Sequence, residues 1–257
     1  MYTSADPVSL LSLPTFLGFV AALLALAWLS RQLSLHLQSL IYLLTRSSDL
    51  TIVLFFLLLL PGVVIHEAAH WFAARLLGLK TGKFRVWPKK QGKYLGLGSV
   101  TVQRGNIWQD TMIGMAPLIV GTALLALIGE HIFQVFYFST ALSGQRWVDS
   151  WRAFQQALQQ PDGILWAYLL FAIGNVMMPS ASDREPVKPL LLYSGIALII
   201  YLLLGLPLTP FALMLDWLAP VLYHLSSTLL FTIVLDVFIL GALFLVIQLI
   251  APRREVK

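Results

Sequence analysis

Residues 50–78 read LTIVLFFLLLLPGVVIHEAAHWFAARLLG, and residues 50–65 contain no charged side chain. About 20 consecutive apolar residues are enough for a helix to cross the hydrocarbon core of a bilayer, so this stretch predicts a transmembrane helix. The whole chain of 257 residues is 58% hydrophobic and only 11% charged, which leaves too little polar surface to cover a water-soluble globule of this size. In hydrocarbon every backbone polar group needs an internal partner, which favours helices for such long apolar runs. The sequence therefore predicts an all-α polytopic membrane protein in a lipid bilayer.

Six apolar segments are long enough to be spanning helices. They lie at about 14–30, 50–78, 108–133, 163–182, 188–207 and 226–250. Two other segments are amphipathic or ambiguous: we interpret 31–46 as an interfacial helix, and 208–224 leaves the count open. With no internal repeat and no room for a separate soluble domain, residues 1–257 are predicted to form a single membrane-embedded domain of about six transmembrane helices.

Basic residues gather in the connection after the second segment, and such clusters mark the cytoplasmic side of a membrane. The residues are Lys80, Lys83, Arg85, Lys89, Lys90, Lys93 and Arg104. With six spans, both termini also fall on the cytoplasmic side. The formal charge of +5 is then a topology signal, and no nucleic-acid partner is predicted.

The same connection contains two β-favouring runs, KFRVW at 83–87 and YLGLGSVTV at 94–102. They are separated by PKKQGK, whose Pro, Gly and polar residues suit a turn. A small β-hairpin at about 83–103 is predicted on the cytoplasmic side. It is either a functional element or a solvated connection.

The sequence HEAAH occupies residues 66–70, inside the second segment. On a helix His66 and His70 lie one turn apart on the same face, as two ligands of a tetrahedral Zn²⁺ must. Glu67 then lies beside the metal, where a carboxylate can take a proton from water and pass it to a leaving nitrogen. The alternative is that three polar residues satisfy one another in a bundle. Because ionisable groups inside spanning helices are costly and usually functional, amide hydrolysis is the favoured interpretation.

Catalytic zinc sites use three protein ligands and a water, so one ligand remains to be found, and the absence of cysteine leaves His or a carboxylate. The other histidines, His36, His131 and His224, fall at the predicted outer face. The stretch GNVMMPSASDREP at 174–186 closes the fourth apolar segment on the cytoplasmic side, where Pro179 breaks the helix. Asp183, at this cytoplasmic end of the segment, is the predicted third ligand. The alternative is a capping Asp183 paired with Arg184 or Lys188.

These features resemble the site-2 protease family of intramembrane metalloproteases. The resemblance consists of HExxH in one spanning helix and of Asn175, Pro179 and Asp183 at the cytoplasmic end of a later one. The family's later motif reads roughly NxxPxxxxDG, and Asn175 and Asp183 keep its eight-residue spacing. Pro179 lies four residues after Asn175 where the family usually has three, and Arg184 replaces the usual Gly.

The resemblance implies Zn²⁺ held by His66, His70 and Asp183, with Asn175 near the scissile carbonyl. The stretch GMAPLIVG at 114–121 resembles the small-residue and proline stretch of the family's next span, although plain helix packing would also explain it. The basic hairpin resembles the family's β element, which is thought to hold the substrate in extended form.

The predicted function is therefore that of an intramembrane zinc metalloprotease, with Glu67 as general base and Asn175 as a catalytic donor. It would hydrolyse a peptide bond in or near a transmembrane segment of a membrane-protein substrate, unwound to an extended form. The alternative is a membrane transporter or metal-binding membrane protein that uses the same polar cluster. A transporter would favour polar residues strung across the bilayer, whereas here they cluster at one level.

Overall fold

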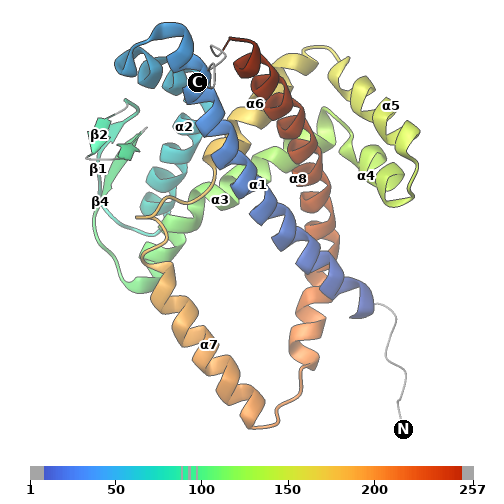
Figure 1. Cartoon of the computed structure of the whole chain (residues 1–257). Coiled ribbons are helices and arrows are strands. Elements are labelled where there is room, and N and C mark those ends of the chain that lie inside the picture. The colour runs from blue at the N-terminus through green and yellow to red at the C-terminus, as the bar shows by residue number, and fades with distance from the viewer. Residues whose placement is uncertain (1–8, 88, 92–93, 97, 251–257) are drawn as a thin grey trace, which may run out of the picture.

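The computed structural model describes residues 9–87, 89–91, 94–96 and 98–250, and it is a mostly helical bundle with a small β element at one side (Figure 1). The elements in chain order are α1 (Ser9–Thr45), α2 (Ser48–Leu76), β1 (Thr81–Arg85), β2 (Lys89–Gln91), β3 (Tyr94–Gly96), β4 (Ser99–Val102), α3 (Ile107–His131), α4 (Val135–Ser143), α5 (Trp147–Leu158), α6 (Gly163–Val176), α7 (Val187–Leu203) and α8 (Thr209–Ile250).

Within the described residues, four helices are long and apolar enough to cross a membrane, namely α1, α2, α3 and α8. They match four of the six predicted segments and identify the chain as a multi-pass membrane protein. The other two segments form shorter apolar helices, α6 with 14 residues and α7 with 17. A count of six spans therefore stays a prediction.

The predicted interfacial helix at 31–46 is not a separate element. Helix α1 continues through it to Thr45, because no Pro or Gly interrupts the stretch and because Leu33 and Leu37 are buried in a cluster with Phe55 and Phe56 of α2. The ambiguous segment at 208–224 is likewise continuous with the last predicted span, since both belong to the 42-residue helix α8.

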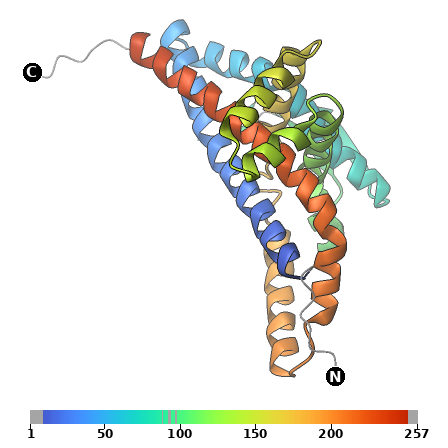
Figure 2. The same ribbon diagram turned by 90° about the vertical axis from the view of Figure 1, so that its right-hand side faces the viewer.

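The two longest helices, α1 and α8, run side by side in the same direction and make the most extensive helix contact of the bundle. Both begin near the lower end of the molecule and finish near its top (Figures 1 and 2). The described ends of the chain, Ser9 and Ile250, therefore lie toward opposite ends of the molecule. This arrangement gives no support to the prediction that both termini lie on one side.

Helix α2 carries the HEAAH sequence and is held tightly against α6. Gly62 allows this approach, because a Cβ there would overlap the carbonyl oxygen of Ala172 in α6. Phe56, Leu59 and Val63 on the same helix are almost fully buried in the cluster that Phe171 of α6 joins. The helix begins at the Ser47 cap, whose side chain accepts a hydrogen bond from the Leu50 amide.

The predicted β element is present. Strands β1 and β4 form an antiparallel pair with Phe84 opposite Val100, and the short strands β2 and β3 between them form a second antiparallel pair. The pairing brings β4 back toward α2, the helix from which the chain entered the sheet.

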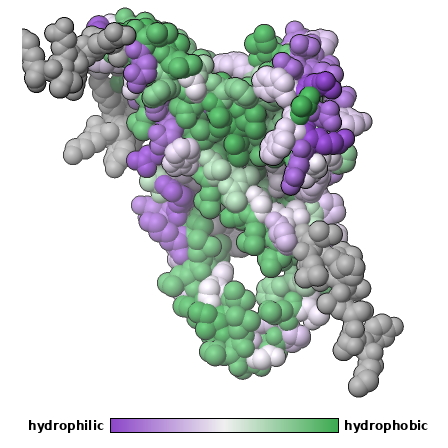
Figure 3. Space-filling view, turned by 45° about the vertical axis from the view of Figure 1, so that its right-hand side comes forward, coloured by the Kyte–Doolittle hydropathy of each residue, from purple (hydrophilic) through white to green (hydrophobic). Residues whose placement is uncertain are grey.

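Helix α7 stands apart from the bundle and returns through a tight turn to the first part of α8 (Figure 1). None of its described residues is buried. The space-filling view shows apolar side chains over this arm and over much of the bundle, with hydrophilic side chains gathered in separate zones (Figure 3). An apolar helix with no buried residue is suited to direct contact with lipid.

Candidate metal centre

His66 and His70 project from one face of α2, one turn apart, as the sequence predicted. Their Nε2 atoms are 3.2 Å from each other. The Nδ1 atom of His66 lies 2.8 Å from the carbonyl oxygen of Val176 at the end of α6, and that of His70 lies 2.8 Å from the carbonyl oxygen of Ile113 in α3. A carbonyl only accepts hydrogen bonds, so each neutral ring carries its proton on Nδ1 and presents the Nε2 lone pair to the other.

Asp183 comes from the turn between α6 and α7 and faces both imidazoles. Its Oδ1 lies 3.5 Å from Nε2 of His70 and its Oδ2 lies 3.7 Å from Nε2 of His66. The Ser180 amide donates to Oδ2 at 2.8 Å, and the Asp183 amide donates to the Ser180 hydroxyl at 3.3 Å. These two reciprocal hydrogen bonds close the turn. Helix α6 ends before this turn because Pro179 follows its cap closely.

Burial alone raises the pKa of the Asp183 carboxyl. The interactions with His66 and His70 and the hydrogen bond from Ser180 outweigh burial and hold this pKa well below its usual range. The third predicted ligand is therefore a carboxylate at neutral pH.

The backbone of the Asp183 turn rests directly on α3. A Cβ at Gly114 would overlap the carbonyl oxygen of Asp183 and lie 3.2 Å from its carbonyl carbon. Gly121, two helical turns further along α3, is similarly close to Met177, with 2.5 Å from an added Cβ to the Cβ of Met177. The small residues of the sequence GMAPLIVG thus let α3 approach the end of α6 and the turn that presents Asp183.

The three side chains fit a tetrahedral metal ion. Their ligand atoms all lie within 4.8 Å of one another, and His70 and Asp183 are largely shielded from solvent. Two zinc–ligand bonds of about 2.0–2.1 Å that meet at the tetrahedral angle place their donor atoms roughly 3.3–3.4 Å apart. The measured separations of 3.2, 3.5 and 3.7 Å are close to this edge length. Three electron-pair donors that face one another at this distance, with no donor hydrogen between the rings, can hold a metal ion.

Glu67 lies next to this cluster on α2 and is 8% exposed. The backbone N–H of Val100 in β4 hydrogen-bonds its carboxylate. A Cβ at Gly98 would lie 2.6 Å from the Glu67 Cγ and 2.8 Å from Oε1, so a larger residue at this position would displace the Glu67 side chain. The segment that leads into β4 therefore covers Glu67 from one side.

Asn175, the residue before Val176, faces helix α8. Its Nδ2 donates to the Phe171 carbonyl at 2.9 Å and to Oδ2 of Asp236 at 3.0 Å. Asp236 is fully buried, and the Oδ1 atoms of both residues have no hydrogen-bond partner in the described structure. A role beside a scissile carbonyl stays a prediction, and it requires the Asn175 amide to exchange Asp236 for substrate.

Three residues contribute to the site without a distinctive signal in the sequence. The carbonyls of Ile113 and Val176 orient the histidines, but any residue type supplies a carbonyl. Gly98 is visible only as one of several glycines in the predicted hairpin. His36 and His224 have other partners, since Nδ1 of His36 lies 2.8 Å from the Gln32 carbonyl oxygen and Nδ1 of His224 lies 2.7 Å from Oε1 of Glu130.

Comparison of the chain with protein-family models, with curated proteins and with solved structures finds no match. A function can therefore be inferred only from the residues of the site and their geometry.

Proposed function

We propose that this protein is a zinc-dependent intramembrane peptidase that cleaves membrane-protein substrates. The observation that carries the proposal is the convergence of His66, His70 and Asp183, whose ligand atoms are separated by distances that suit a tetrahedral metal ion. Glu67 lies beside the two histidines on α2. The residues come from two distant parts of the chain, and the sequence motifs that suggested them resemble those of the site-2 protease family.

The donor set of two imidazoles and one carboxylate suits zinc and leaves a fourth position for water or substrate. When bound there, zinc would polarise a substrate carbonyl and make a water molecule more acidic. The carbonyls of Val176 and Ile113 fix both imidazole rings so that Nε2 points to the shared centre. Among the described residues, His66, His70 and Asp183 form the group of His and carboxylate side chains that could hold a metal ion.

Glu67 would act as the proton carrier. As a carboxylate it can accept a proton from water and deliver it to the nitrogen of the departing amine. The hydrogen bond from the Val100 amide fixes one side of this carboxylate. The short contact at Gly98 limits the water that can reach it from the side of the sheet.

Strand β4 would present the substrate. It pairs with β1 along one edge, while its Val100 amide is directed to Glu67. An extended peptide that added to this strand would therefore pass beside the general base. Strand addition also suits the chemistry, because a peptide bond inside a helix is shielded from attack.

The proposed topology has the four long apolar helices as full crossings, with α6 and α7 each crossing part of the bilayer, and it places the opening of the site on the cytoplasmic side. The supporting observation is the concentration of basic residues in the connection between α2 and α3, from which Gly98 and Val100 lie next to Glu67. Six full crossings would return both termini to one side of the membrane, whereas Ser9 and Ile250 lie toward opposite ends of the molecule, so the proposal does not include six full crossings.

The test uses purified protein, its bound metal and a single-span membrane protein as model substrate. Glu67→Gln should retain about one zinc per chain and lose cleavage, since the amide cannot accept the proton. His66→Ala should lose both zinc and cleavage, whereas Glu185→Gln, on the exposed turn, should retain both. Undiminished cleavage by Glu67→Gln would end the mechanism. Metal transport into vesicles without any cleavage by the wild type would support the transporter alternative instead.

A further inference from the structure

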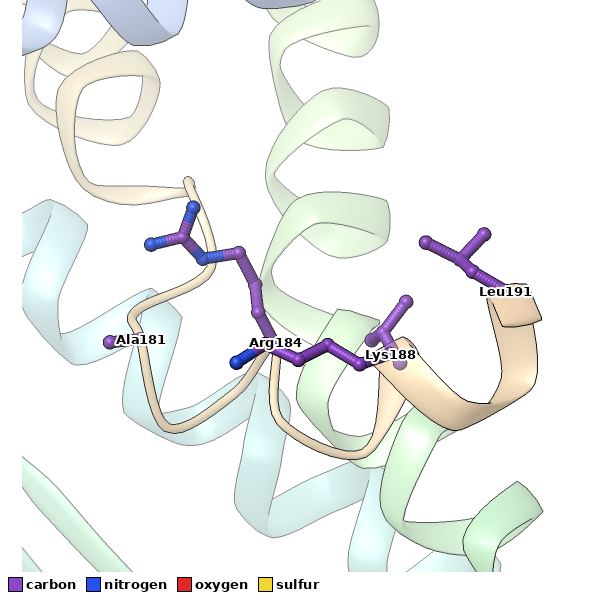
Figure 4. A pocket seen from close by; sticks show the side chains of 5 residues that line it. Ala181, Arg184, Lys188 and Leu191 are labelled. Atoms are coloured by element: carbon purple, nitrogen blue, oxygen red, sulfur yellow. The ribbon is translucent and has the colours of Figure 1, made fainter.

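A pocket of about 400 Å³ lies where the Asp183 turn meets the first turns of α7 (Figure 4). It is lined by Ala181, Arg184, Val187, Lys188 and Leu191. Asp183 faces the histidines, whereas its neighbour Arg184 faces this pocket. The pocket is therefore separate from the metal centre although both use the same turn.

Two cationic side chains give the pocket its charge. The Arg184 Nε donates to the Ser180 carbonyl at 3.2 Å, which holds the guanidinium above the turn, and Lys188 extends back toward Arg184 (Figure 4). Among the residues that the structure describes, no carboxylate lies within ion-pair distance of either side chain. Two uncompensated positive charges at one pocket favour an anionic ligand.

The remaining lining is apolar. Val187 and Leu191 are four residues apart and so lie on one face of α7, beside the two cations. Below them α7 continues as a helix with no buried residue. At about 1.5 Å per residue it extends for roughly 25 Å, close to the thickness of a bilayer core. The pocket thus joins a cationic rim to an apolar surface suited to acyl chains.

We propose that Arg184 and Lys188 bind the headgroup of an anionic phospholipid of the bilayer, with an acyl chain along Val187 and Leu191. A soluble anion would use only the cationic rim, whereas a phospholipid matches both halves of the lining. Arg184 distinguishes this site from the site-2 protease family that the motifs resemble, because that family usually has glycine at this position. It does not rest on the proposed peptidase function, since lipid binding can be measured without any cleavage.

The experiment measures binding of dioleoylphosphatidylglycerol and of dioleoylphosphatidylcholine to the detergent-solubilised full chain by native mass spectrometry. Each basic side chain near a membrane surface strengthens anionic lipid binding by roughly fivefold, so Arg184→Gln/Lys188→Gln should weaken phosphatidylglycerol binding about 30-fold. Binding of phosphatidylcholine should change little. Lys188→Gln alone, which leaves the Arg184 contact with the turn intact, should weaken phosphatidylglycerol binding about fivefold.

The matched control is Lys80→Gln/Lys83→Gln, which removes the same charge from exposed residues near β1 and should leave binding within about twofold of wild type. An equal loss in this control would overturn the proposal in favour of diffuse charge attraction. Unchanged binding in the pocket variants would overturn it as well. Displacement of the lipid by millimolar glycerol 3-phosphate would show that the apolar wall contributes nothing, and would replace the phospholipid with a soluble phosphate ligand.

Discussion

Replacing Gly114 with alanine should displace Asp183 from the metal centre without touching any proposed ligand. The added Cβ would overlap the Asp183 carbonyl oxygen and lie 3.5 Å from its Cα. Normal C···O contacts are about 3.3–3.6 Å, so the overlap is relieved only if the turn moves by about 1 Å. Metal–ligand distances tolerate only about 0.2 Å. A shift of this size therefore removes the carboxylate from the coordination shell.

The expected effect is a loss of zinc affinity of about 100-fold, or about 2.8 kcal/mol, at the upper end of what changes in supporting residues usually cause. Competition with a chromophoric zinc chelator on the purified protein measures it directly. Two controls are built into the chain, because a Cβ at Gly18 or at Gly241 meets nothing within 4 Å. Gly18→Ala and Gly241→Ala also place alanine in a helix, and both should bind zinc as the wild type does.

Wild-type zinc affinity in a folded Gly114→Ala protein would refute this reasoning, because either the turn is free to move or Asp183 is not a ligand. A comparison with Asp183→Ala separates these outcomes. If Asp183→Ala also binds zinc normally, the third ligand must be sought elsewhere. If only Asp183→Ala loses zinc, the ligand is correct and the contact with α3 is unimportant.

Three other predictions test neighbouring parts of the structure. Asp183→Ala should lose zinc and cleavage, whereas Glu185→Ala, two residues away, should keep both in the same chelator and cleavage assays. Val100→Pro should slow cleavage at least tenfold with unchanged zinc content, because proline removes the amide that β4 directs to the general base; a normal rate would make the strand a mere connector. Asp236→Asn should unfold thermally near the wild-type temperature, since an amide oxygen can accept the same hydrogen bond from Asn175, whereas Asp236→Leu should lose about 1–3 kcal/mol of stability because one Nδ2 hydrogen of Asn175 loses its acceptor; an equal loss in both variants would mean that Asp236 is needed as a charge.

The helical bundle and the grouping of His66, His70 and Asp183 could be predicted because their signals are local or chemically distinctive. Four apolar segments became long helices, and HEAAH placed two imidazoles on one helix face. Asp183 could be predicted by elimination, since the chain has no cysteine and its other histidines lie elsewhere. The extent of the helices was harder, because helix α1 continues through 31–45 on tertiary contacts of Leu33 and Leu37 that the amphipathic pattern does not specify.

The partner of Asn175 could not be predicted from the motif that singled it out. Asp236 lies 61 residues later in the chain, and its pairing with Asn175 depends on how α6 and α8 cross. The sequence favoured a helix-pairing role for an intramembrane carboxylate in general, but it does not specify the partner. A motif residue can thus be engaged in the packing of the bundle, and its catalytic role has to be tested separately.

Asp183 reaches the histidines although the sequence around it departs from the site-2 protease pattern that it resembles. The position of the carboxylate depends on the closed turn with Ser180 and on the contact of its backbone with Gly114. Neither interaction uses the side chain of Arg184, and Pro179 needs only to end α6 before the turn begins. The departures from that pattern at Pro179 and Arg184 therefore leave the Asp183 carboxylate facing both imidazoles. They change instead the outer face of the turn, where Arg184 meets the pocket beside α7.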